Sequence, residues 1–153
     1  MKAERGKPER SAEATALALL AGREHSRLEL QRKLLQRGYA VDDIDTALAA
    51  LAENGYLDDN RAAAARLASG LRRGHGPGRI RADLHGAGLD SSGLNAQAED
   101  AAVDWCVEAR RVALKRFGET PPADYQEWAC RARFLQARGY DSETIRKALG
   151  DGE

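Results

Sequence analysis

Arginine and lysine side chains form three groups along the chain. Their charge and close spacing could allow each group to bind an anion. Such cations form ion pairs and hydrogen bonds with carboxylates of a protein partner or with phosphates of DNA. The candidate interface residues are Arg72, Arg73, Arg79 and Arg81 around a turn at 74–78; Arg110, Arg111, Lys115 and Arg116 at the end of one predicted helix; and Arg131, Arg133 and Arg138, near Arg146 and Lys147. For each group the alternative is a solvated helix face, or compensation of a helix dipole for the second group.

Charge is unevenly distributed along the chain although it cancels overall, with 24 basic and 24 acidic side chains. Residues 1–60 hold nine basic and eleven acidic side chains, whereas residues 61–81 hold six arginines and no acid. Zero net charge argues against a generic nucleic-acid coat and suits a protein partner as well as DNA.

No catalytic, cofactor or metal motif is present in the sequence. A phosphate-binding GxxxxGK[ST] loop, a nucleophile elbow and an HExxH motif are all missing. His25, His75 and His85 lack metal-ligand spacing. The sequence therefore predicts neither an enzyme nor a bound cofactor or metal.

Several bulky or soft side chains are expected in the core. Trp105 and Trp128 are predicted core anchors, with base-stacking platforms as the alternative. Tyr56 is also expected inside, and Cys106 and Cys130 are expected to be buried as small hydrophobic residues.

The composition, together with residues that typically start and stop helices, predicts an all-α protein of about nine helices. Alanine and leucine fill most apolar positions, and both are strong helix formers. Capping signals and stop glycines predict helices at 11–21, 26–37, 41–54, 58–73, 77–88, a short one after 90–92, 99–117, 124–138 and from 142 on. The clearest start is the capping box of Ser26 and Glu29. On the long seventh helix, the predicted apolar side carries Val103, Cys106, Val107, Leu114 and Phe117.

One helix–glycine–helix element recurs three times, at separations of 50 and 51 residues. It aligns on Gly38, Gly88 and Gly139, with a leucine four positions before, an apolar residue directly after, and an aliphatic residue six positions after. A helix that ends in a left-handed cap requires glycine there, and the following apolar residue folds back on the last turn. The alternative is that these glycines are ordinary helix-stop residues of a helical bundle without a repeat.

This period predicts three tandem three-helix repeats at 11–56, 57–97 and 98–153, after a disordered tail at 1–10. Units of about fifty residues cannot bury a large core alone, so the copies should share surface in an elongated, curved arrangement.

Four blocks of the chain resemble the RecX family, in order and in register. The first block has Arg23, Ser26, Glu29, Leu30, Lys33, Leu34 and Gly38; the second has Gly55, Tyr56, Leu57, Asp58, Asp59 and Ala63; the third has Gly76, Pro77, Arg79, Ile80, Leu84, Gly88 and Leu89; the fourth has Arg133, Phe134, Leu135, Arg138, Gly139, Tyr140 and Ile145. The chain departs from the pattern at Ala62, where an aromatic is usual, and at Asp83, where Glu is usual.

The resemblance implies a regulatory protein that lies in the groove of the RecA filament and inhibits its ATP hydrolysis, strand exchange and co-protease activities. Such a role affects DNA repair and the SOS response. The alternative is a direct DNA binder of helix-turn-helix type, although the third helix opens with Val41, Asp42 and Asp43, which would repel phosphates. No signal peptide or membrane span is recognised, so a cytoplasmic monomer is expected, with weak DNA contact possible through the basic groups.

Overall fold

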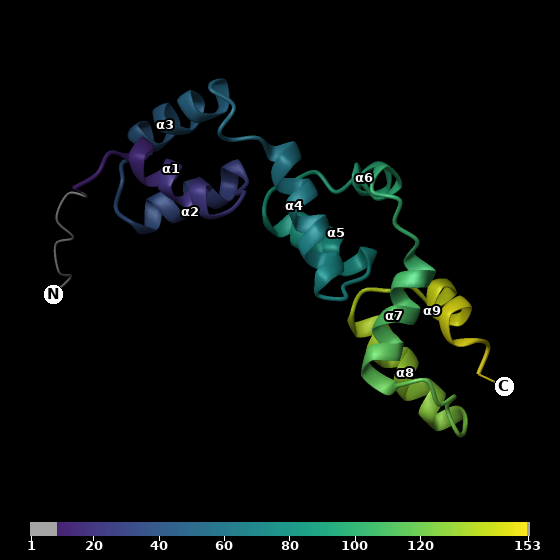
Figure 1. Ribbon diagram of the computed structural model, residues 1–153. Helices are drawn as coiled ribbons and strands as arrows, with labels where there is room; N and C mark the ends of the chain where they lie inside the picture. The colour runs from purple at the N-terminus through teal and green to yellow at the C-terminus, as the bar shows by residue number, and fades with distance from the viewer. Residues whose placement is uncertain (1–8, 153) are drawn as a thin grey trace, which may run out of the picture. The chain divides into compact units, whose positions relative to one another are not determined.

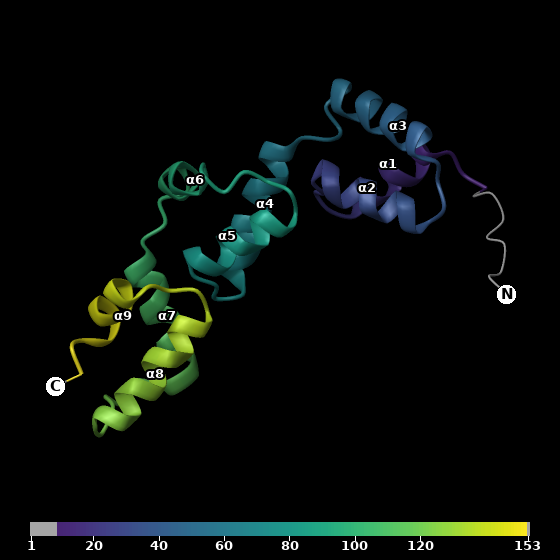
Figure 2. The same ribbon diagram turned by 180° about the vertical axis from the view of Figure 1, so that it is seen from behind.

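The computed structural model describes residues 9–152, and within that range the chain is entirely helical and turn, with no strand. The helices are α1 (Ala12–Gly22), α2 (Arg27–Gln36), α3 (Val41–Glu53), α4 (Asp59–Arg72), α5 (Pro77–Gly86), α6 (Leu94–Asp100), α7 (Trp105–Phe117), α8 (Tyr125–Ala137) and α9 (Ser142–Leu149). Figure 1 shows them along the chain, and Figure 2 shows the same ribbon from behind. The predicted all-α class is confirmed. Most of the predicted disordered tail, residues 1–8, lies outside the described residues.

The chain divides into two compact units. The N-terminal unit holds the described residues up to Ala65 together with Gly86–Leu89, and the C-terminal unit holds Arg66–His85 and the described residues from Asp90 on. In the N-terminal unit, α1, α2 and α3 pack side by side. Their core consists of Ala16, Leu30, Leu34, Ile44, Leu48, Leu51 and Leu57.

The capping box at the start of α2 is also a tertiary contact. Ser26 Oγ accepts from the backbone N–H of Glu29, and Glu29 Oε1 accepts from the backbone N–H of Ser26. The same hydroxyl donates to the carbonyl of Ala87 at 2.6 Å, so the fully buried Ser26 joins α2 to the turn after α5 within the N-terminal unit. This explains why a serine, with one donor and two acceptor lone pairs, stands at this cap.

The three copies of the repeated element have the same local geometry. Gly38, Gly88 and Gly139 all have positive φ, at 89°, 70° and 100°. The leucine four positions before each glycine is fully buried in all three copies: Leu34, Leu84 and Leu135. The aliphatic residues six positions after the glycines are also buried: Ile44, Leu94 and Ile145. The predicted repeat of a left-handed cap between two core contacts is therefore confirmed.

In the C-terminal unit, α7, α8 and α9 pack against one another. Their core is formed by Ala109, Val112, Ala113, Leu135, Tyr140 and Ile145. Aromatic rings complete it, with Phe117 and Phe134 edge to face at 5.3 Å between ring centroids. Small residues on α7 permit this close packing, since the buried face of that helix is mostly alanine and valine.

The prediction that a helix runs unbroken from 99 to 117 was wrong. Residues 99 and 100 end α6, Ala102 follows with φ 55°, and α7 begins only at Trp105. Asp104 supplies the reason, because its carboxylate accepts from the N–H groups of Cys106 and Val107 and caps a new helix. The predicted apolar side of this helix was wrong at Val107 and Leu114, which are half exposed, whereas Phe117 packs against the core as predicted.

Two further burial predictions were wrong. Tyr56 is 54% exposed, and Cys130 is an exposed thiol on α8. Trp105 is half-buried against the core of the C-terminal unit, as predicted for a core anchor. Trp128 instead lies at the edge of that unit, stacked on Tyr125 at 5.8 Å, with its Nε1 donating to the carbonyl of Gly150.

No helix within residues 9–152 combines the length and the apolar character that crossing a bilayer requires.

Candidate anion-binding site

A hollow of 710 Å³ in the C-terminal unit is lined by most of the cations that the sequence predicts as candidate interface residues. We call it the arginine pocket. Its charged lining consists of Arg72, Arg73, Arg79, Arg111, Lys115, Arg116 and Arg138. Gly74, His75, Val112 and Phe134 complete the wall, so no carboxylate is among the residues that line it.

The end of α4 brings the first two arginines to the pocket. Gly74 follows Arg72 and Arg73 with φ 77°, and the N–H of His75 returns to the carbonyl of Gly70 at 2.8 Å. This left-handed ending turns the chain sharply into α5. A Cβ on Gly74 would stand 3.0 Å from a methyl of Val112, so the turn lies directly on α7.

The turn between α4 and α5 also packs on the turn between α8 and α9. The N–H of Gly76 donates to the carbonyl of Arg138 at 2.7 Å, and the N–H of Gly78 donates to the carbonyl of Gly139 at 2.9 Å. A Cβ on Gly76 would stand 2.6 Å from the carbonyl carbon of Gly139, so only glycine permits the approach. This contact places Arg79, in the first turn of α5, beside Arg138.

Three side chains from the last bundle bind the carbonyl end of α4. Arg111 Nη2 donates to the carbonyl of Leu71 at 3.0 Å, and Arg138 Nη1 donates to the carbonyl of Arg73 at 2.9 Å. The hydroxyl of the buried Tyr140 lies 3.3 Å from the carbonyl of Gly74, and burial raises the pKa of that hydroxyl to about 12. Cations and donors stabilise a helix at this end, where unpaired carbonyls carry partial negative charge. The floor of the arginine pocket is therefore held in one arrangement.

The charges around the pocket are largely uncompensated. Arg111 Nη2 lies 2.8 Å from Glu108, three residues before it on α7. Arg116 and Arg138 lie over the ring of Phe134, at 5.8 and 5.0 Å from its centroid. Five lining side chains have no ion pair or hydrogen bond to any described residue: Arg116, which contacts only aromatic rings, and Arg72, Arg73, Arg79 and Lys115.

His75 is the buried polar group of this wall. It is 6% exposed, and its Nδ1 has no hydrogen-bond partner among the described residues. Asp83 Oδ2 lies 3.9 Å from that nitrogen, too far for a hydrogen bond. Burial lowers the pKa of His75, and the neighbouring charge of Arg79 lowers it further.

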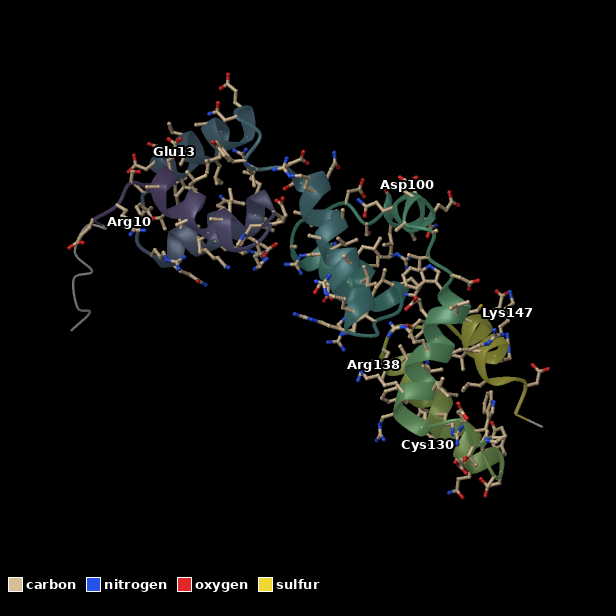
Figure 3. All side chains as sticks on the ribbon, viewed as in Figure 1. Arg10, Glu13, Asp100, Cys130, Arg138 and Lys147 are labelled. Atoms are coloured by element: carbon tan, nitrogen blue, oxygen red, sulfur yellow. The ribbon has the colours of Figure 1, made fainter. Side chains whose placement is uncertain are left out.

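The structure brings together seven of the eleven candidate cations and leaves four outside the arginine pocket. Arg81 and Arg133 are exposed on α5 and α8, and Arg110 donates to the carbonyl of Lys147 on α9. Arg131 is 7% exposed, since its guanidinium lies over Phe117 at 5.2 Å and Nη2 contacts Glu127 at 2.8 Å. Figure 3 shows Arg138 and Lys147 among all the side chains of the unit.

Two neutral members of the wall, Phe134 and Val112, carry no sequence signal that would assign them to a site. Each looks like an ordinary core position of its helix. Only the contact between turns 62 residues apart in the sequence, at Gly76 and Arg138, brings them to the cations of α4 and α5.

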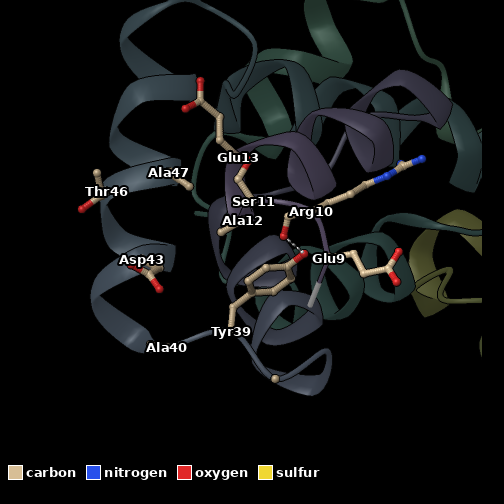
Figure 4. Close-up of a pocket in the computed structure, with 11 residues that line it drawn as sticks. Glu9, Arg10, Ser11, Ala12, Glu13, Tyr39, Ala40, Asp43, Thr46 and Ala47 are labelled. Carbon is tan, nitrogen blue, oxygen red and sulfur yellow. Dashed lines mark hydrogen bonds between the residues drawn. The ribbon is translucent and has the colours of Figure 1, made fainter. Parts of the chain in front are cut away.

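A second hollow, of 580 Å³, lies in the N-terminal unit and has the opposite charge character. Figure 4 shows it between the start of α1 and α3, with Tyr39 donating to the carbonyl of Arg10 at 2.8 Å. Glu9, Glu13 and Asp43 contribute carboxylates, and Arg10 is its one cation among the lining residues. Within residues 9–152 no group of three or more His, Cys, Asp or Glu side chains could hold a metal ion.

Comparison with known proteins identifies the family. Models of the first and third three-helix domains of RecX match residues 12–51 and 107–149. The regulatory protein RecX of Acidithiobacillus ferrooxidans is 48% identical over 139 residues, covering 91% of this chain and 89% of that protein. The chain belongs to the RecX family. The RecX protein of Vibrio vulnificus is 41% identical over 145 residues, covering 94% of each chain.

Solved structures agree with the fold. The crystal structure of RecX from Lactobacillus salivarius matches with a TM-score of 0.70 at 18% identity, over 90% of this chain and 92% of that one. A second crystal structure of a regulatory protein RecX matches with the same score at 19% identity, over 90% of this chain and 72% of that one. Membership confirms the predicted family and the three-helix domains, and it makes the chain a non-enzymatic regulatory protein of RecA.

Proposed function

We propose that this RecX protein binds the RecA nucleoprotein filament in the cytoplasm, as a monomer, and inhibits its ATPase, strand-exchange and co-protease activities. In this proposal the arginine pocket is part of the contact with the filament. Family membership supports the inhibition of RecA. The arginine pocket supports the position of the contact surface on this chain, because filaments of a recombinase on DNA offer both acidic protein patches and phosphates.

The observation that carries the proposal is the set of unpaired cations on one preorganised wall. Arg72, Arg73 and Arg79 meet Lys115 there, with no carboxylate in the lining. Interfaces use such charges to speed encounter and to fix register, and arginine is enriched at their centres. The exposed Arg81, Arg110 and Arg133 do not line the pocket, so we expect them to contribute less to the contact.

Direct, sequence-specific DNA reading is the weaker proposal. A recognition helix presents polar and basic side chains at its start. Asp42 and Asp43 are exposed in the first turn of α3, and Glu143 is exposed in the first turn of α9. Acids at these positions would repel phosphates, so we expect any DNA contact of the isolated chain to be weak and salt-sensitive.

We also propose that the repeats divide as the sequence predicts, at 11–56, 57–97 and 98–153. The positive φ of the three repeated glycines and the burial of their leucines support this division.

Co-sedimentation with RecA assembled on single-stranded DNA tests the proposal. We expect the chain to pellet with the filament at about 200 mM salt and to bind naked single-stranded DNA only near 50 mM, because counterion release dominates non-specific binding. The pocket variant, Arg79→Ala with Lys115→Ala, should lose most filament binding. The matched control, Arg81→Ala with Arg133→Ala, removes the same charge from outside the pocket and should retain it. Equal binding to filament and naked DNA would overturn the proposal in favour of direct DNA binding.

A further inference from the structure

The arginine pocket holds more positive charge than the protein itself compensates. Seven cations line the hollow, and within residues 9–152 Glu108 is the one carboxylate that pairs with any of them, at Arg111. Like charges around one concavity repel, and low-dielectric walls strengthen that repulsion. An anion with several charges in a small volume would relieve it, whereas one carboxylate would offset only a small part.

His75 is the buried polar side chain of the same wall. The imidazole is more than nine-tenths buried and lines the hollow, and among the described residues its Nδ1 has no hydrogen-bond partner, with Oδ2 of Asp83, a residue outside the lining, 3.9 Å away. A buried polar atom without a partner costs about 1–3 kcal/mol, so such atoms in native proteins are usually satisfied by water or a bound group. An anion in the hollow would counter the neighbouring charges of Arg79 and Arg138 that, with burial, lower the pKa of His75.

The size and lining of the hollow narrow the ligand class. Its volume of 710 Å³ lies in the range of about 300–1,000 Å³ that is usual for small-molecule sites. Val112 and Phe134 are the only apolar side chains among the lining residues, and the guanidinium groups of Arg116 and Arg138 already lie over the Phe134 ring. The wall therefore recognises charge and not an aromatic or aliphatic body.

Adjacent phosphates suit this set of guanidinium groups better than separate carboxylates, because they concentrate more charge in a small volume. Arginine presents a planar fork of donors that matches two oxygens of a phosphate, and six of the seven lining cations are arginines. Adjacent phosphates concentrate several charges and many acceptor oxygens within a few ångströms. Acidic peptides carry one charge per side chain and would need a longer, more open groove to engage this many cations.

We infer that the arginine pocket binds a polyphosphate chain, such as that of a nucleoside di- or triphosphate, without specific contact to the nucleoside. The inference goes beyond the proposed function because it concerns the isolated chain and does not require RecA. The bound nucleotide occupies the same cations as the filament contact, so the two ligands compete.

Isothermal titration of the full chain in magnesium-free buffer tests this, with ATP, pyrophosphate, adenosine and a 15-residue oligo-dT as separate probes. We expect ATP to bind with a Kd below about 100 µM, which corresponds to a modest affinity for a polyanion in a preformed site. Pyrophosphate should bind within about fivefold of ATP, and adenosine should not bind, since the phosphates make the contacts.

Variants decide whether the pocket is responsible. The pocket variant Arg79→Ala with Lys115→Ala should weaken ATP binding by at least about tenfold, and the control Arg81→Ala with Arg133→Ala should change it by less than about twofold. Circular dichroism verifies that both are folded. The inference would be overturned if both variants lost ATP binding equally, or if the wild-type chain did not bind ATP up to about 1 mM. It would also be overturned if oligo-dT bound through the pocket while ATP did not bind. None of these results would alter RecA inhibition by the wild-type chain, so the two proposals fail separately.

Discussion

Gly139 lies so close to Arg79 that a Cβ on Gly139 would stand 2.5 Å from the backbone nitrogen of Arg79. This approach joins the turn before α9 to the first turn of α5 and sets the position of one wall of the arginine pocket. The effect of the close approach can be separated from the effect of the positive φ at Gly139. Other glycines of the C-terminal unit have a positive φ but no close neighbour.

Gly139→Ala should therefore be much more destabilising than Gly118→Ala. Both positions have left-handed backbones, at φ 100° and 79°, but a Cβ on Gly118 meets nothing within 4 Å. We expect about 1–2 kcal/mol for Gly118→Ala from backbone strain alone, and at least about 3 kcal/mol for Gly139→Ala, where a clash with backbone is added. Urea unfolding followed by tryptophan fluorescence measures both, because Trp105 and Trp128 lie in this unit. Equal losses would mean that the two turns do not pack as described.

The two serine caps of the N-terminal unit offer a similar comparison. Ser11 caps α1 by accepting from Ala14 at an exposed site, whereas Ser26 caps α2 and also donates to the buried carbonyl of Ala87. Ser11→Ala should cost about 1 kcal/mol, the usual value of an N-cap. Ser26→Ala should cost about 2–3 kcal/mol, since a buried carbonyl loses its donor as well. Hydrogen exchange of the α2 amides reports the second value, and similar costs for both serines would exclude a tertiary role for Ser26.

Acid should destabilise the N-terminal unit through His25. This side chain is buried, with Nδ1 donating to the carbonyl of Arg23 at 3.0 Å and Nε2 accepting from Lys33 at 2.9 Å, so it is held neutral. Burial, with smaller contributions from the charges of Arg23 and Lys33, lowers its pKa below the ordinary 6.5. The unfolded state then binds a proton that the folded state does not, and the free energy of unfolding falls as the pH drops below 6.5 until the folded pKa is passed.

The slope of that fall reaches at most about 1.4 kcal/mol per pH unit for one proton. His25→Gln should flatten the profile of the free energy of unfolding of this unit between pH 7.5 and 5, to be followed by hydrogen exchange. The exposed His85 supplies the control, since His85→Gln should leave the profile unchanged. A profile that His25→Gln does not alter would contradict the assignment of the neutral tautomer.

Arg131 and Arg133, neighbours on α8, should behave in opposite ways. Arg131 is buried between Phe117 and Glu127, so Arg131→Ala should cost about 1–3 kcal/mol through lost packing and a lost charged contact. Arg133 is exposed, and Arg133→Ala should change the free energy of unfolding by no more than about 0.5 kcal/mol. Denaturant unfolding by tryptophan fluorescence separates them, and a neutral Arg131→Ala would show that this guanidinium is a surface group.

Local signals explain which parts of the fold were predictable. The repeated glycines, their leucines and the Ser26 capping box act within a turn of helix, so sequence spacing alone predicts them, and the structure confirms them. The seventh helix was misplaced because an aspartate within a run of good helix formers is an ambiguous signal. Asp104 caps a new helix there, and this turns Val107 and Leu114 toward solvent.

The candidate site was predictable only in part, for a different reason. Charge runs identify which cations are available, but not which of them meet. Arg81 and Arg79 are two positions apart on α5, yet only Arg79 lines the arginine pocket together with Arg138, because a helix rotates its side chains by about 200° over two residues. The meeting of α5 with Arg138 depends on backbone bonds from Gly76 and Gly78 to a turn some sixty residues away, which has no local signature.

The ATPase rate of RecA on single-stranded DNA, with the purified protein titrated in, measures inhibition of RecA by this chain. We expect the rate to fall steadily below equimolar ratios, with the variant Arg79→Ala plus Lys115→Ala requiring at least about fivefold more protein than Arg81→Ala plus Arg133→Ala for the same effect. A rate that stays unchanged up to equimolar wild-type protein would contradict it.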